Sequence, residues 1–187
     1  PDIGILSEEF LEDVRHMKER NLAVELLERL LKDDIKSRFK TNVVQQAKFS
    51  ELLQQSLQRY RNRAIETAQV IEELIEMAKK FHAAALRGEE LGLNGDEMAF
   101  YDALATNEAA VRELGDETLK AIAVELTQRL RSSVTVDWSV RETVRARLRV
   151  MVKTLRKRYK YPPARQYEAT ETVLRQAESL SEAWVGG

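Results

Sequence analysis

The chain has 187 residues, of which 43% are hydrophobic and 33% charged, so it can bury the core of a domain-sized unit. Its 30 Lys and Arg nearly balance its 31 Asp and Glu. The absence of cysteine excludes disulfides, thiolate metal sites and a cysteine nucleophile. No apolar run approaches the roughly 18 residues that span a membrane, and no signal peptide is visible. We therefore expect a cytoplasmic location and no membrane partner.

The net charge of −1 conceals a strongly basic segment. Residues 141–165 contain ten Lys and Arg and a single acid, Glu142, so this segment carries +9 and the other 162 residues carry −10. A total charge near zero is therefore no argument against a polyanionic partner.

Helix is the predicted state along the chain, because prolines occur only at positions 1, 162 and 163 and helix-forming residues abound. Ser7 is a candidate N-cap for the first helix. A second helix is predicted by apolar residues that recur at steps of three and four, namely Val24, Leu27, Leu31 and Ile35.

The longest uninterrupted pattern runs from about 42 to 86. Its apolar positions recur with a mean step of about 3.6 residues, the period of an α-helix. They are Leu53, Leu57, Tyr60, Ala64, Ala68, Ile71, Ile75 and Ala78. We therefore predict one long helix over 42–86.

Glycines mark the next boundaries. The loop 88–95 is the clearest internal break, and Asn94 with Glu97 predicts a capping box that opens a short helix. Gly115 predicts a helix end, and Asp116 a new cap. A further helix contains Leu119, Ile122, Leu126 and Leu130.

The basic helix is predicted to begin at Asp137 or Ser139 and to end before Pro162. Its expected core-facing stripe is Val140, Val144, Leu148, Met151 and Leu155, and a last helix carries Ala169, Val173, Ala177, Leu180 and Trp184. The prediction is an all-α fold without a sheet, an irregular multi-helix bundle built around the long helix. We expect a single domain over 1–187, with a candidate sub-boundary at 88–95.

Patterns for catalysis are weak. Asp34-Ile35-Lys36 resembles part of a nuclease motif, but it lies in a helical stretch and not on a strand. No glycine is followed by lysine, so a phosphate-binding P-loop is absent. The two histidines, His16 and His82, lack the repeated carboxylate spacing of a helical metal site. We predict no catalytic, cofactor-binding or metal-binding residue.

The basic helix is the strongest candidate for a functional surface, because guanidinium and ammonium groups at helical spacing can contact phosphates or an acidic protein. The alternative is that this helix binds no partner and that its charges pair with acidic residues elsewhere in the chain. The candidate partner or DNA contacts are Arg141, Arg145, Arg149, Lys153, Arg156, Lys157, Arg158 and Lys160.

Four segments in order resemble one family. They are Arg59-Tyr60-Arg61-Asn62-Arg63-Ala64-Ile65, then the run from Gly92 to Leu104, then Val136-Asp137-Trp138, and Tyr159-Lys160-Tyr161-Pro162-Pro163. Together they resemble the C-terminal helical domain of the restriction (R) subunit of type I restriction–modification enzymes. Lys160 is a departure, since the family often has glycine there.

The resemblance implies a larger parent subunit, with an N-terminal endonuclease and two RecA-like motor domains that translocate DNA with ATP and Mg²⁺. It implies that this region helps to hold the R subunit on the methyltransferase core of M and S subunits, beside the motor domains. The sequence begins at Pro1 without Met, as expected for an excised fragment. None of the parent's catalytic motifs falls in these residues, so we expect no cofactor and no catalysis in the fragment.

Three functions stay open at this stage. The chain is an assembly module that docks on the methyltransferase core, a module that binds duplex DNA through phosphates, or a helical brace whose charges pair internally. An enzymatic function is a distant fourth.

Overall fold

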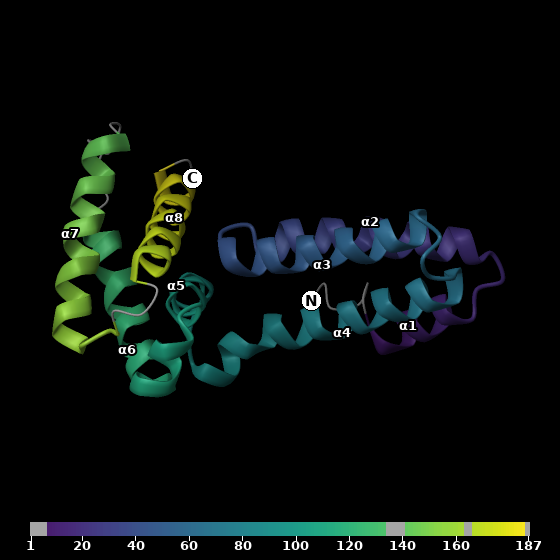
Figure 1. Ribbon diagram of the computed structural model, residues 1–187, viewed down its shortest axis with the longest axis horizontal. Helices are drawn as coiled ribbons and strands as arrows, with labels where there is room; N and C mark the ends of the chain where they lie inside the picture. Colours follow the sequence, from purple (N-terminus) through teal and green to yellow (C-terminus); the bar gives the residue numbers. More distant parts are fainter. Residues whose placement is uncertain (1–6, 134–140, 163–165, 186–187) are drawn as a thin grey trace. The chain divides into compact units, whose positions relative to one another are not determined.

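The computed structural model describes residues 7–133, 141–162 and 166–185 (Figure 1). Within these ranges every regular element is a helix, so the all-α prediction is confirmed. The helices are α1 (Glu8–Arg15), α2 (Arg20–Arg38), α3 (Val43–Arg61), α4 (Thr67–Leu91), α5 (Gly95–Ala105), α6 (Glu108–Ser133), α7 (Arg141–Tyr159) and α8 (Gln166–Val185).

The chain divides into two compact units. Unit 1 comprises Pro1–Lys40 and Gln46–Arg87, and unit 2 comprises Thr41–Gln45 and Gly88–Gly187. The chain therefore passes from unit 1 to unit 2 and back before its final crossing within α4. The expectation of a single domain over the whole chain stays a prediction.

Unit 1 is a helical bundle with its own core. Ser7 caps α1 by accepting a hydrogen bond from the Phe10 N–H at 3.2 Å, as predicted. The predicted stripe of α2 is buried against α3 and α4. Three phenylalanines, Phe39, Phe49 and Phe81, pack with ring centroids 5.1 to 5.8 Å apart and join the end of α2 to α3 and α4.

The prediction of one helix over 42–86 is wrong, because α3 ends at Arg61 and α4 begins at Thr67. Arg63 has a left-handed backbone with φ of 58°. The Ala64 N–H donates to the Arg59 carbonyl at 2.8 Å, and the Arg63 N–H donates to the Tyr60 carbonyl at 3.0 Å. These two bonds form a Schellman motif, which closes a helix C-terminus.

The break between α3 and α4 is not visible in the sequence, and the reason is physical. A Schellman motif usually has glycine at its left-handed position, because other residues pay a steric cost there. Here the position is occupied by Arg63, so no glycine or proline marks the turn. The apolar period also continues through the turn, although Ala64 and Ala68 are exposed.

Unit 2 contains α5 to α8 and the end of α4. The predicted capping box is present, since the Asn94 side chain accepts from the Glu97 N–H and the Glu97 carboxylate accepts from the Asn94 N–H. Gly115 interrupts α6 with φ of 75°, which confirms the predicted break there. The end of α4 closes with another Schellman motif, in which Gly92 takes the left-handed position.

The segment Thr41–Gln45 joins unit 2 through buried polar contacts. The fully buried Gln176 of α8 accepts from the Val43 N–H at 3.0 Å and donates to the Thr41 carbonyl. Asn42 donates to Asp102 of α5 at 2.8 Å. We call this set of contacts the polar latch, and it fixes residues that are about 60 and 130 positions apart in the chain.

Candidate interaction surface on the basic helix

The basic helix is α7, and it packs into unit 2 along one face. Leu148, Val152 and Leu155 are buried, and Met151 is half-buried. Val152 therefore lies in the core, although the predicted stripe did not include it. Met151, which the predicted stripe included, is less buried than Val152. Val140 lies outside the described residues, as do Asp137, Ser139 and Trp138, and the side chain of Val144 is not described.

Two of the candidate arginines contact α8. Arg145 forms ion pairs with Glu178 at 2.5 Å and with Glu171 at 3.6 Å. Arg149 lies 3.6 Å from Glu171, and its side chain is 58% exposed. Arg145 thus serves the packing of α7 against α8, whereas Arg149 keeps much of its guanidinium in solvent.

Arg156 is turned inward. It donates to the Thr170 hydroxyl at 2.6 Å and stacks over the Tyr161 ring at 5.3 Å from the centroid. Burial lowers the pKa of Arg156. Tyr161 is buried, whereas Arg156 is half-buried. Tyr161 donates to the Leu104 carbonyl at 2.7 Å, and burial raises its pKa to about 12. Arg156 is therefore part of the structure at the end of α7 and not of an open surface.

Arg158 belongs to a network centred on Glu125 of α6. The Glu125 carboxylate pairs with Arg158 at 2.5 Å and with Arg129 at 2.9 Å, and it accepts from the Tyr159 hydroxyl at 2.7 Å. The hydrogen bond from Tyr159 and the two arginines hold the pKa of Glu125 below its ordinary value, against the effect of desolvation. Glu125 is a residue that the sequence did not single out, since a lone Glu in a charged helix carries no signal.

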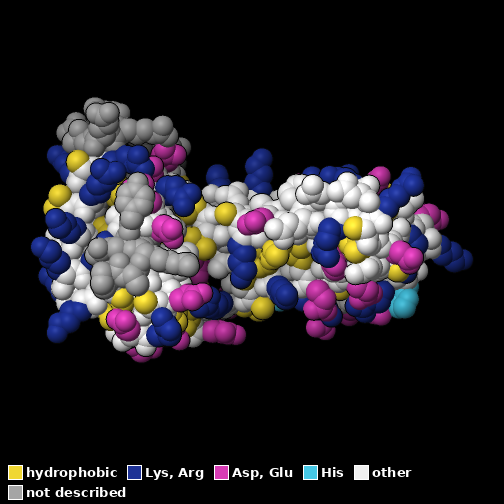
Figure 2. Space-filling model, viewed as in Figure 1, with side chains coloured by type: hydrophobic (Ala, Val, Ile, Leu, Met, Phe, Trp, Pro, Cys, Tyr) yellow, Lys and Arg dark blue, Asp and Glu magenta, His cyan; other side chains and the backbone are white. Residues whose placement is uncertain are grey.

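The three candidate lysines face solvent. Lys153, Lys157 and Lys160 are exposed and form no ion pair within the described ranges. Arg147 is also exposed and unpaired among these residues, and Figure 2 shows basic side chains gathered over α7. We call Lys153, Lys157 and Lys160 the lysine row. The side chain of Arg141 is not among those described.

Lys160 closes α7 in a left-handed conformation with φ of 55°. The Tyr161 N–H donates to the Arg156 carbonyl at 2.9 Å, and the Lys160 N–H donates to the Lys157 carbonyl at 3.4 Å, so this is also a Schellman motif. This geometry explains the glycine that the resembling family often has at this position, because glycine adopts a positive φ without steric cost.

The charge segregation of the sequence lies entirely inside unit 2. Unit 1 contains 15 of the 30 Lys and Arg and 15 of the 31 Asp and Glu, so its net charge is zero. Unit 2 therefore combines the +9 of residues 141–165 with −10 elsewhere. Arg145, Arg149 and Arg158 form ion pairs with acidic residues of unit 2. The lysine row forms none within the described residues, so it remains a positively charged face.

The described residues also bear on the other candidate sites. The described part of the chain contains no group of three or more His, Asp and Glu side chains arranged to hold a metal ion. His16 is exposed and lies 3.0 Å from Glu12, and Asp34 pairs with Arg38 within α2. None of the described helices is long and apolar enough to cross a bilayer.

Comparison with known proteins decides the family. Residues 1–183 match the family described as type I restriction enzyme HindI endonuclease subunit-like, C-terminal. The chain belongs to this family. The resemblance to the C-terminal region of a type I restriction subunit is therefore confirmed.

Two relatives match this chain over only a small part of their own length. The type I restriction enzyme HindI endonuclease subunit of Haemophilus influenzae is 41% identical over 186 residues, which cover 100% of this chain and 18% of that protein. A Methanocaldococcus jannaschii protein, provisionally named type I restriction enzyme MjaIXP endonuclease subunit, is 31% identical over 162 residues. They cover 83% of this chain and 15% of that protein.

The chain thus spans less than a fifth of the length of these two relatives. Both names describe a subunit, that is, one component of a larger enzyme. No solved structure shows significant similarity to the chain.

Proposed function

We propose that this chain is a non-catalytic assembly module of a type I restriction endonuclease subunit. It docks that subunit on the methyltransferase core of M and S subunits, and the lysine row of α7 contacts the core. The nuclease and the ATP- and Mg²⁺-dependent motor belong to other parts of the parent subunit, as the family resemblance implies.

The observation that carries this proposal is the unpaired positive face of α7. Lys153 and Lys157 lie one helical turn apart, with a rise of about 6 Å, and Lys160 follows at the end of the helix. Arg145, Arg149 and Arg158 already have acidic partners inside unit 2. Arg156 is held by Thr170 and Tyr161, so these four bases do not require an external partner. A row of exposed ammonium groups without acidic neighbours favours an acidic surface on the partner.

Pull-down of the full R subunit with the methyltransferase core tests this proposal. The variant Lys153→Glu/Lys157→Glu/Lys160→Glu reverses the lysine row, and we expect at least tenfold weaker association, because like charges then face each other. The matched control reverses three exposed lysines of unit 1 that have no ion pair in the described ranges, Lys18, Lys36 and Lys40. Unchanged association of the α7 variant would remove the lysine row from the interface.

A second candidate is a contact with duplex DNA through phosphates, and the same lysine row supports it. In this case affinity falls with salt, with a slope of about −0.9 in log–log units for each phosphate contacted. Reversal of the lysine row is expected to reduce that slope by about the contribution of three phosphates. Binding of the R subunit to DNA in gel-shift assays at several salt concentrations measures it, and an unchanged slope contradicts this candidate.

A further inference from the structure

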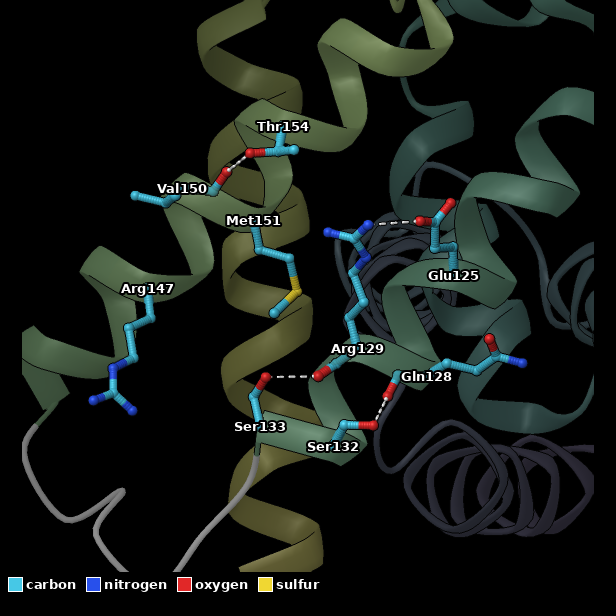
Figure 3. A pocket seen from close by; sticks show the side chains of 9 residues that line it. All are labelled: Glu125, Gln128, Arg129, Ser132, Ser133, Arg147, Val150, Met151 and Thr154. Atoms are coloured by element: carbon cyan, nitrogen blue, oxygen red, sulfur yellow. Dashed lines mark hydrogen bonds and ion pairs between the residues drawn. The ribbon is translucent and has the colours of Figure 1, made fainter.

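Beside the lysine row, unit 2 has an open groove between α6 and α7. One part of it has a volume of about 640 Å³ and is lined by residues from both helices, among them Arg129, Arg147 and Met151. Met151 points from α7 toward Arg129 of α6 (Figure 3). A second hollow of about 500 Å³ shares Glu125 and Gln128 with the first and extends along α6 to Glu117. The two hollows therefore adjoin each other along α6, and α7 borders only the first of them. We call the two together the groove.

The groove has apolar surface. Val150 is 66% exposed, more than any other large hydrophobic residue identified as exposed in the described ranges. Met151 and Val124 are half-buried and line the first and second hollow. An exposed apolar strip beside polar rims is a feature of surfaces that bind a protein partner.

The charges of the groove are satisfied except at its outer edge. Glu125 and Arg129 are paired with each other, so a partner that covers them leaves no charge unpaired. Arg147 has no ion pair in the described ranges and points away from α6 in Figure 3. A partner that buries Arg147 is expected to supply a carboxylate, because removal of an unpaired cation from water is unfavourable.

The length and composition of the groove favour a helix of a protein over a nucleic acid. Glu117 to Ser133 spans about 24 Å along α6, which matches a helix of roughly 16 residues. The surface has an apolar strip at Val124, Val150 and Met151, and a phosphate backbone offers no apolar side chains to cover it. Helices bind such grooves through apolar residues at i, i+3, i+4 and i+7.

We infer that the α6–α7 groove binds an acidic amphipathic helix of the methyltransferase core. The apolar face of the bound helix covers Val124, Val150 and Met151, and one carboxylate of that helix pairs with Arg147. This inference rests on the proposed assembly function and adds the chemistry of the contact. The groove lies next to the lysine row on α7, so the same acidic helix or its neighbours meet both surfaces.

Photo-crosslinking in the assembled enzyme tests the inference. A photoreactive amino acid replaces Val150 in one full-length R subunit, Gln128 in a second, and the exposed Arg175 of α8 in a control. After assembly with the methyltransferase core, the crosslinked peptides are identified by mass spectrometry. We expect positions 150 and 128 to crosslink to the same stretch of the core, a net-negative segment with helical apolar spacing.

Several results would overturn the inference. They are crosslinks to DNA, to the R subunit itself or to a basic segment, and crosslinks no stronger than those of position 175 in a complex that assembles normally. In that last case the assembly function stands and the groove is excluded. Failure of the wild-type subunit to assemble would end both proposals.

A charge reversal gives an independent readout. Arg147→Glu is expected to weaken association with the core at least tenfold, whereas Arg175→Glu, the same change on an exposed part of α8, leaves it unchanged. Equal effects of the two substitutions would show that Arg147 has no specific carboxylate partner.

Discussion

At the scale of single residues, the left-handed positions explain features that composition does not reveal. Arg63 and Lys160 end α3 and α7 with φ of 58° and 55°, where glycine is the usual residue. Both are long cationic side chains that are exposed to solvent, so nothing in their burial requires the strained backbone. The strain is a local cost that the two Schellman hydrogen bonds at each site offset.

Lys160→Gly is therefore expected to stabilise the protein. Glycine relieves the steric cost of the positive φ, and we expect the free energy of unfolding to rise by about 0.5–1 kcal/mol. The control is Lys157→Gly within the last turn of α7, where glycine costs about 1 kcal/mol in helix propensity. Urea denaturation measures both, and destabilisation by Lys160→Gly would contradict the strain argument.

At the scale of helices, Glu125 connects α6 to the end of α7. Its carboxylate holds two arginines and one tyrosine, and only 21% of its side chain is exposed. These contacts stabilise the ionised carboxylate, so they lower the pKa of Glu125. The acidic and basic parts of unit 2 thus meet in a specific contact and not only by average charge.

Glu125→Gln is expected to lower the free energy of unfolding by about 1–2 kcal/mol at pH 7, because two charged hydrogen bonds are weakened. A group with a lowered pKa stabilises the folded state above its unfolded pKa, near 4.5, and loses this contribution as pH falls through its folded pKa. The difference between wild type and variant should therefore shrink below about pH 4.

Thermal and urea unfolding from pH 7 to pH 3 measure this difference. Glu113→Gln, the same change at an exposed position of α6, serves as the control and is expected to stay within about 0.5 kcal/mol of wild type. A difference for Glu125→Gln that does not change with pH would refute the role of its ionised form.

At the scale of the whole molecule, the chain crosses between two units, and the polar latch holds one of these crossings to unit 2. Gln176 accepts from the Val43 N–H and donates to the Thr41 carbonyl, and both of these backbone groups belong to half-buried residues. The start of α3 is thus anchored by a side chain about 130 residues later in the sequence.

Gln176→Ala is expected to lower the free energy of unfolding by about 2–4 kcal/mol, since it leaves two backbone groups unpaired and opens a cavity. Gln128→Ala, at an exposed position of α6, is expected to cost less than about 0.5 kcal/mol. Hydrogen exchange should show faster exchange of the Val43 amide in the Gln176 variant. Unchanged protection at Val43 would mean that the latch does not hold this segment.

The sequence alone determined the helical class, the caps at Ser7 and Asn94, the break at Gly115, the basic helix and the family. These features depend on local propensity, side-chain spacing and motifs, which act over a few residues. Only the tertiary structure decided the turn at Arg63, because its signal is a backbone conformation that arginine rarely adopts.

Tertiary structure also decided which bases of α7 are free. The sequence placed Arg145, Arg149, Arg156 and Arg158 together with the lysines as equal candidates, but their partners lie on α6 and α8 and around Tyr161. Pairing of charges across helices depends on packing over distant parts of the chain, which helical spacing does not encode. The lysine row and the groove beside it are what remains of the basic helix once those internal contacts are made.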